Sequence, residues 1–377
     1  MFPPYFANRD REILAFRECL QSTLAGHPRH MAVLGDSALG KTSMLLKFRR
    51  LAIEKGCLAS LGSPYVVDDA ESFAHGIIRT LALQIHASYS ESVWDRLARA
   101  LGLQDPAVSA LDASLRRHFA RTGDAQTALR TYLRIIAEHT RHLAPAILIM
   151  VDDVDRFRDA YQAVAVLQRT LIELAGENAN VMAILTSGTD RLEAETVTSL
   201  EPCFTSMKLD RLSDKAIMDA LIGPIAGTPL RLDHKVADRI VELAAGHPYY
   251  LQELAYQTFE MADPDYRVTP HTFELALEQT FYRVSVPIFE QRMASLDHGE
   301  RHLLAVVVHL EASTSLGELA DAAAAAGLDD TTVPQLAERL AAKGCIAQVS
   351  APSEEPHYSM PDPLFREYVR RHLDWIP

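Results

Sequence analysis

The segment from Gly35 to Thr42 reads GDSALGKT, and it follows directly on the apolar run Met31–Leu34. The stretch after it, Ser43–Arg50, has the composition of a helix. A turn of the form G-x-x-x-x-G-K-[ST] between a strand and a helix is the pattern of a phosphate-binding loop, or P-loop. Such a loop lies at the carboxyl edge of a parallel sheet, so this one segment already predicts an α/β fold.

The residue types of the loop indicate how a phosphate is held. Two glycines allow the backbone to curl so that consecutive N–H groups point inward, and the following helix adds its positive N-terminal end. The Lys41 ammonium places a charge on the outer phosphates, and the Thr42 hydroxyl is a suitable ligand for Mg²⁺. We therefore predict that the phosphates are bound by Ser37, Ala38, Leu39, Gly40, Lys41, Thr42 and Ser43.

A second element of this kind is the apolar run Ala146–Val151, which ends in the two acids Asp152 and Asp153. This is the Walker B arrangement, in which the first carboxylate holds Mg²⁺ beside Thr42 and the second orients or deprotonates the attacking water. On the residues alone an acidic pair can instead cap the following helix, and that alternative stays open. Asp155 fits a helix start or a polar contact better than a metal ligand.

A third predicted strand, Val181–Thr186, runs into Ser187 and Gly188. A small polar side chain at the end of this strand can reach the γ-phosphate or the attacking water and act as a sensor. We favour Ser187 slightly over Thr186 for this role. The alternative is that serine and glycine simply form the turn.

The order of these motifs, together with Asn8-Arg9-Asp10-Arg11-Glu12 and Gly246-His247-Pro248, resembles the AAA+/STAND group of P-loop ATPases. The likeness is to the archaeal-type and origin-recognition-like members and spans roughly residues 5–290. It implies ATP or ADP with Mg²⁺ as ligands. It also implies that the backbone at Asn8 and Arg9 lies near the adenine, although Asn8 stands where the group usually has glycine. Pro248 matches the proline that packs near the base or ribose, although the same triplet would break a helix in any protein.

Two departures from the group bear on the rate of hydrolysis. AAA+ enzymes usually end Walker B in Asp-Glu, and the shorter Asp153 places its carboxylate about one C–C bond farther from the water, which predicts slow turnover. The arginine finger that many AAA+ proteins carry is not evident either, because this chain reads Pro202-Cys203-Phe204 at that place. Three other arginines are candidates to substitute for it, or are plain surface charges: Arg191, Arg211 and Arg231.

The pattern of elements predicts three domains. Strands alternate with helices up to residue 210, which predicts a P-loop NTPase domain over 1–210 whose parallel sheet is covered by helices on both faces. Helices alone continue through 211–296, as expected of a helical lid. Residues 297–377 contain three predicted helices, a hairpin and a closing helix, which is the order of a winged-helix domain.

Charge argues against nucleic acid as the main partner. The formal net charge is −13, and the predicted third helix of the last domain, Val333–Ala342, offers only Gln335, Arg339 and the following Lys343 for a DNA groove. The predicted wing carries Glu354-Glu355, where a DNA-binding wing is usually basic. Since phosphate contacts supply most non-specific affinity, we expect a protein partner or self-association rather than DNA.

The sequence also argues against a membrane-spanning, a secreted or a disulfide-rich protein. No apolar run approaches the ~20 residues of a membrane span, and the N-terminus lacks the basic-then-apolar pattern of a signal peptide. The 4 cysteines lie far apart and form no C-x-x-C pair, which predicts a reduced, cytoplasmic protein. The sequence thus predicts a slow Mg²⁺-dependent ATPase that acts as a molecular switch. A DNA-loading or remodelling ATPase and a non-hydrolysing nucleotide-bound scaffold are the alternatives.

Overall fold

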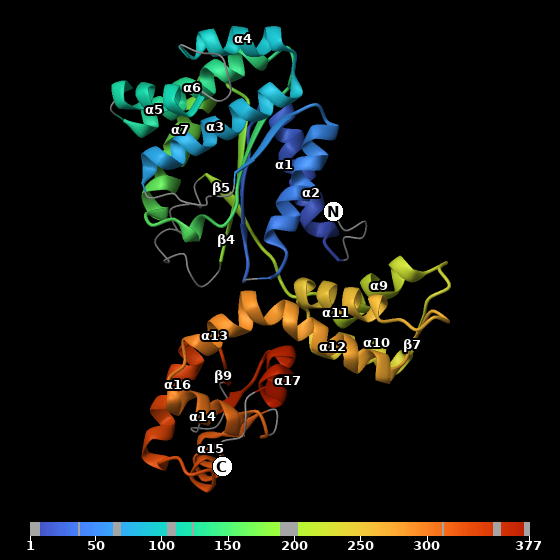
Figure 1. Ribbon diagram of the computed structural model, residues 1–377. Helices are drawn as coiled ribbons and strands as arrows, with labels where there is room; N and C mark the ends of the chain where they lie inside the picture. The colour runs from blue at the N-terminus through green and yellow to red at the C-terminus, as the bar shows by residue number, and fades with distance from the viewer. Residues whose placement is uncertain are drawn as a thin grey trace. The chain divides into compact units, whose positions relative to one another are not determined.

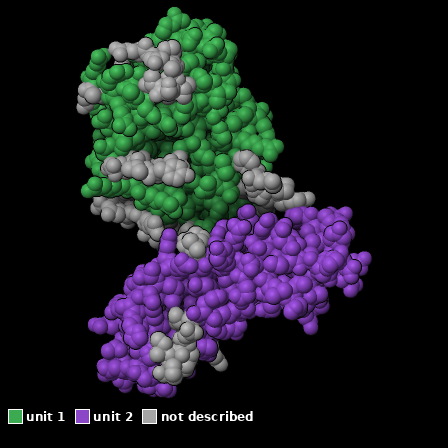
Figure 2. All heavy atoms as spheres, in the orientation of Figure 1, with its two compact units in different colours: residues 1–3, 8–210 green, residues 4–7, 211–377 purple. Residues whose placement is uncertain are grey.

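A computed structural model describes residues 8–36, 38–62, 69–103, 111–122, 124–188, 203–310, 313–349 and 356–372. The chain divides into two compact units, coloured separately in Figure 2. We call residues 8–210 the N-terminal unit and residues 211–377 the C-terminal unit, and each is described by itself. None of the described helices is long and apolar enough to cross a membrane.

The N-terminal unit is built on a five-stranded sheet of strand order β2-β3-β4-β1-β5. Every neighbouring pair of these strands is parallel. The predicted parallel P-loop NTPase sheet is therefore confirmed. Its strands are β1 (His30–Leu34), β2 (Leu58–Gly62), β3 (Ile147–Val151), β4 (Val181–Ser187) and β5 (Phe204–Lys208).

Helices cover both faces of this sheet, as Figure 1 shows. On one face lie α1 (Asp10–Leu24) and α2 (Lys41–Glu54), which are joined by stacking of the Phe16 and Phe48 rings at 4.2 Å. The helices on the other face include α3 (Ala70–Ser88), α6 (Ala125–Thr140) and α7 (Ala160–Gly176). Two further helices of this unit are α4 (Glu91–Ala100) and α5 (Leu111–Thr122).

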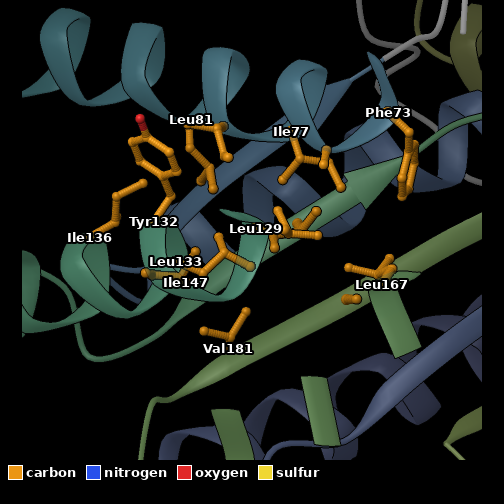
Figure 3. Packing of buried hydrophobic residues seen from close by; sticks show 14 of the residues in the cluster. Phe73, Ile77, Leu81, Leu129, Tyr132, Leu133, Ile136, Ile147, Leu167 and Val181 are labelled. Atoms are coloured by element: carbon orange, nitrogen blue, oxygen red, sulfur yellow. The ribbon is translucent and has the colours of Figure 1, made fainter. Parts of the chain in front are cut away.

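The main core of the unit lies between the sheet and the second helical layer. Phe73, Ile77 and Leu81 repeat every four residues along α3 and so share one face of that helix. Figure 3 shows them packed with side chains of α6 and with Ile147 and Val181 from the strands. Because both faces of the sheet are buried, the central strands are continuous apolar runs rather than alternating ones.

The C-terminal unit is mainly helical. Its helices are α9 (Asp214–Ile222), α10 (His234–Ala244), α11 (Pro248–Glu260), α12 (Pro270–Val284), α13 (Glu290–Ala294), α14 (His298–Val307), α15 (Leu316–Ala325), α16 (Val333–Ala342) and α17 (Pro363–His372). Short strands β6 (Arg231–Leu232) and β7 (Arg267–Val268) pair in parallel. An antiparallel sheet of order β8-β10-β9 contains β8 (Thr314–Ser315), β9 (Ala347–Val349) and β10 (His357–Ser359).

One hydrophobic cluster runs through this whole unit, from Leu212 to Val369. The predicted lid and the predicted last domain therefore share a core, and the division between residues 296 and 297 stays a prediction. In the last part, α14, α15 and α16 precede the β9–β10 hairpin and α17. This is the predicted order of elements, and the winged-helix assignment remains our interpretation of it.

Candidate functional site

The P-loop connects β1 to α2 at the carboxyl edge of the sheet. Gly40 has φ +88° and Ala38 has φ +66°, so the backbone turns through the left-handed region twice within three residues. At Gly35 a Cβ atom would lie 3.1 Å from Leu209 Cβ and 3.3 Å from its carbonyl oxygen. The loop thus curls closely against the residues that follow β5, and glycine suits this crowded position. The predicted phosphate contact Ser37 lies outside the described residues.

Lys41 is the first residue of α2, and its side chain turns back into the loop. Its Nζ donates hydrogen bonds to the carbonyl oxygens of Gly35 at 2.7 Å and Asp36 at 3.0 Å. The residue is only 8% exposed. The ammonium therefore lies inside the curl of main chain where the sequence predicts the phosphates.

Asp152 lies at the carboxyl end of β3 and contacts the start of α2. It follows β3 and is 5% exposed, and its Oδ2 accepts a 2.6 Å hydrogen bond from Thr42 Oγ1 at the start of α2. No ion pair to Asp152 occurs among the described residues. A buried, uncompensated carboxylate beside a hydroxyl is a donor set of the kind that Mg²⁺ prefers. The residues present therefore fit the implied metal.

Asp153 occupies the left-handed region with φ +48°, and its carboxylate lies half-buried, 3.2 Å from Arg156 Nε. Burial, followed by the negative charge of Asp152, raises the pKa of Asp153 above its ordinary value. A carboxylate with a raised pKa is better matched to accepting a proton near neutral pH.

The structure separates the two sensor candidates. Thr186 Oγ1 donates a 2.5 Å hydrogen bond to Asp152 Oδ1, whereas Ser187 Oγ donates to Asp155 Oδ1 at 3.2 Å. Asp155 also accepts from the Gly188 amide at 3.1 Å, so Asp155 makes polar contacts of the predicted kind. Thr186, which we ranked second, thus contacts the Walker B acid in this structure, and Ser187 does not.

Comparison with known proteins agrees with this geometry. Residues 5–184 match the AAA ATPase domain family. The matched segment includes the P-loop and both acids that follow β3. No curated protein matches the chain.

Solved structures support the fold. The Walker-type ATPase of Pyrococcus abyssi is similar with a TM-score of 0.59 at 15% identity, over 97% of this chain and 96% of that one. Cdc6p from Pyrobaculum aerophilum is similar with a TM-score of 0.51 at 13% identity, over 98% of this chain and 94% of that one. At these identities the likeness shows the fold alone.

Near the start of the segment that matches this family, Arg9 of the Asn8-Arg9 motif contacts the P-loop. Asn8 has φ +53°, a conformation that asparagine adopts more readily than most residues, which suits a position where glycine is usual. The buried Arg9 guanidinium donates to the carbonyl oxygens of Leu39 at 3.3 Å and Asp210 at 2.9 Å, and pairs with Glu12 at 3.2 Å. Contacts of Asn8 and Arg9 with the base stay a prediction.

The predicted lid motif belongs to the C-terminal unit. Gly246 has φ +84°, and a Cβ atom there would lie 2.6 Å from Arg211 Cβ and 2.8 Å from the Leu212 carbonyl oxygen. Glycine is therefore required where the triplet packs on the first residues of the unit. Pro248 begins α11, and its contact with a nucleotide stays a prediction. Among the substitute arginines, Arg211 donates to the carbonyl oxygens of Ala245 and Pro361, and Arg191 lies outside the described residues.

Proposed function

We propose that this protein is an ATP-dependent switch that hydrolyses its nucleotide slowly and couples nucleotide state to binding of a protein partner or to self-association. The observation that carries the proposal is the buried Asp152 carboxylate, which is hydrogen-bonded to Thr42 and has no cationic partner among the described residues. Burying a charge without a partner is costly. A Mg²⁺ ion delivered with ATP supplies the missing positive charge.

The surrounding residues have distinct roles in this proposal. The amides of the P-loop and the Lys41 ammonium bind the β- and γ-phosphates, and Asp152 with Thr42 holds the metal, which neutralises charge on the phosphates when bound. Asp153 orients the attacking water and accepts its proton. Because Asp153 is short and pairs with Arg156 at 3.2 Å, we expect this step to be slow.

The C-terminal unit supports the switch because its parts are tied together near Pro248. Tyr250, two residues after Pro248 on α11, donates a 2.9 Å hydrogen bond to Asp362 Oδ2. Asp362 precedes α17 and also accepts from Arg292 of α13 at 2.9 Å. With a shared core as well, a change at the lid motif is expected to move the last helices together with it.

DNA binding through α16 is disfavoured by the contacts of its basic side chains. Lys343 Nζ lies 2.6 Å from Glu300 Oε2, and Arg339 Nε lies 2.9 Å from Glu300 Oε1. Arg339 also pairs with Asp297. Two of the three side chains that the sequence offered to a DNA groove are thus held by acids of the same unit.

A single set of assays tests the proposal. Phosphate release is measured with Mg²⁺, with and without DNA, beside size-exclusion chromatography with ADP or a non-hydrolysable ATP analogue. Slow release that DNA does not change, with a nucleotide-dependent elution volume, supports the switch. Release that DNA stimulates, with steep salt dependence, would favour the DNA-remodelling alternative. Nucleotide that co-purifies without any turnover would favour the scaffold.

Ligand-induced stabilisation tests the site itself. ATP with Mg²⁺ at a hundred times its dissociation constant should add about 2.7 kcal/mol to the free energy of unfolding. Lys41→Ala should remove most of this gain, because it deletes the charge at the centre of the loop. Lys55→Ala, at an exposed position beyond the far end of α2, is the matched control and should keep it. An unchanged gain in Lys41→Ala would contradict the proposed site.

A further inference from the structure

A sensor role, toward either the γ-phosphate or the attacking water, does not explain the position of Thr186. The residue is 0% exposed, and its hydroxyl makes two hydrogen bonds at once. It donates to Asp152 Oδ1 at 2.5 Å and accepts from the backbone N–H of Asp153 at 2.8 Å. One side chain of β4 therefore contacts both acids that follow β3.

This contact follows from the register of the sheet. Val151 of β3 is paired with Leu185 of β4. Asp152 follows Val151 and Thr186 follows Leu185, so these two residues are neighbours across the two strands. Ser187 is one residue further, and adjacent residues on a strand point to opposite faces. Its hydroxyl accordingly contacts Asp155 on another element.

The two oxygens of Asp152 are used differently as a result. Oδ1 accepts from Thr186, and Oδ2 accepts from Thr42. With Oδ1 held, the carboxylate cannot rotate freely, and Oδ2 stays directed at the Thr42 hydroxyl. The bond from Asp153 N–H to Thr186 holds the backbone at the φ of +48° from which the Asp153 side chain departs.

We propose that Thr186 is the positioning residue of the metal site: it orients the Asp152 carboxylate toward Mg²⁺ and fixes the backbone that carries Asp153. This inference rests on the proposed nucleotide function and deepens it. Outer partners of this kind commonly change metal affinity or activity by 10- to 100-fold when they are removed.

The test uses binding as well as turnover. Affinity for ADP is measured in EDTA and over a Mg²⁺ titration for wild type, Thr186→Val and Thr186→Ser. Valine keeps the shape and removes the hydroxyl, so the Mg²⁺ concentration at half-effect should rise roughly 10- to 100-fold, while affinity in EDTA should be unchanged. Serine keeps the hydroxyl and should restore a Mg²⁺ response close to wild type. Thr170→Val is the control, since the buried Thr170 hydroxyl of α7 has no hydrogen-bond partner among the described residues.

The outcomes distinguish failure of the positioning role of Thr186 from failure of the proposed nucleotide-dependent function. A wild-type Mg²⁺ response in Thr186→Val, or a loss in Thr186→Ser as large as in valine, overturns the positioning role and leaves the proposed function intact. Failure of the wild type itself to bind ADP overturns the proposed function and this inference with it. If Thr186→Val does not fold, Thr186→Cys takes its place, because a thiol is a weak donor of similar size. It must shift the Mg²⁺ response in the same direction by a smaller factor, and no shift overturns the inference.

Discussion

Two aspartates, one in each unit, are buried to the same extent and held in opposite ways. Asp152 and Asp362 are each 5% exposed. Asp152 is held by threonine hydroxyls. Asp362 accepts from the Arg292 guanidinium and the Tyr250 hydroxyl at 2.9 Å each, and from the Phe365 amide at 3.0 Å. The C-terminal unit supplies the opposite charge itself, whereas no basic side chain in the described part of the N-terminal unit pairs with Asp152.

Two more acids of the C-terminal unit repeat this arrangement. Glu300 pairs with Lys343 and Arg339, and Glu367 pairs with Arg239, Arg370 and Arg371. Burial opposes ionisation of both glutamates, yet the hydrogen bonds from these basic side chains bring both pKa values below their ordinary range. Burial of an acid therefore does not by itself indicate a functional site, and the chemical nature of its partners is the better guide.

The largest expected effect on stability comes from replacing Asp362 with asparagine, and the same replacement at Asp152 is the comparison. Asp362→Asn leaves the Arg292 guanidinium without its counter-charge, and we expect a loss of about 3–5 kcal/mol in the free energy of unfolding. Asp152→Asn in EDTA removes a charge that has no opposite partner and should cost far less. Urea denaturation, with hydrogen exchange to localise the loss, makes the comparison.

Asp321→Asn, an exposed position on α15, is the control and should be neutral. Should Asp152→Asn in EDTA destabilise the protein as much as Asp362→Asn, the contrast between the two acids would be wrong.

Acid should weaken the N-terminal unit at a milder pH than these C-terminal acids require. His30 of β1 accepts a 3.1 Å hydrogen bond at Nδ1 from the Ala183 amide, and burial lowers its pKa from 6.5 to about 4. The unfolded chain therefore binds this proton first, and stability on the order of 3 kcal/mol is lost as pH falls from 6.5 to about 4. The contributions of Glu300 and Glu367 are complete above their unfolded pKa of about 4.3 and are lost only as pH falls below it.

The measurement is urea denaturation at pH 7 and pH 5, followed by the fluorescence of the buried Trp94 in a Trp375→Phe background. His30→Gln retains an acceptor without a titrating ring and should flatten the pH dependence. If the free energy of unfolding changed equally between pH 7 and pH 5 in wild type and His30→Gln, His30 would not be the cause of the pH dependence.

Much of the N-terminal unit could be predicted from the sequence because its signals are local. A P-loop, and an apolar run that ends in acids, each place their residues at a strand end without reference to the rest of the chain. The choice between Thr186 and Ser187 could not be made that way. It depends on the pairing of Val151 with Leu185, and a shift of one residue reverses which side chain meets Asp152.

The side-chain contacts of the C-terminal unit could not be predicted from the sequence, because they join residues that are far apart in the chain. Arg339 of α16 and Lys343, which follows that helix, are four residues apart and so lie on one face. The sequence offered both to a DNA groove but disfavoured DNA as the partner. Their partner Glu300 lies on α14, some forty residues earlier, and no local pattern announces that pairing. Likewise the spacing of Tyr250, Arg292 and Asp362 gives no sign that they meet.

The smallest expected effect on stability compares Asp153, the acid proposed to act in catalysis, with Asp362, an acid held by the fold. Because the pKa of Asp153 is raised on folding, the native state binds this proton more tightly than the unfolded chain does. Stability therefore falls as pH rises through the window between the unfolded and folded pKa values, and the ionised carboxylate is a net cost at pH 7. Its ion pair with the exposed Arg156 side chain offsets little of this.

Asp153→Asn should consequently raise Tm at pH 7 slightly, on the order of 2 °C, while phosphate release falls by about 10²- to 10⁴-fold. Asparagine also tolerates the positive φ at this position. Asp159→Asn, which keeps the cap on α7, is the control and should change neither quantity. A lower Tm in Asp153→Asn would place Asp153 with Asp362, as an acid that the fold needs for its own stability.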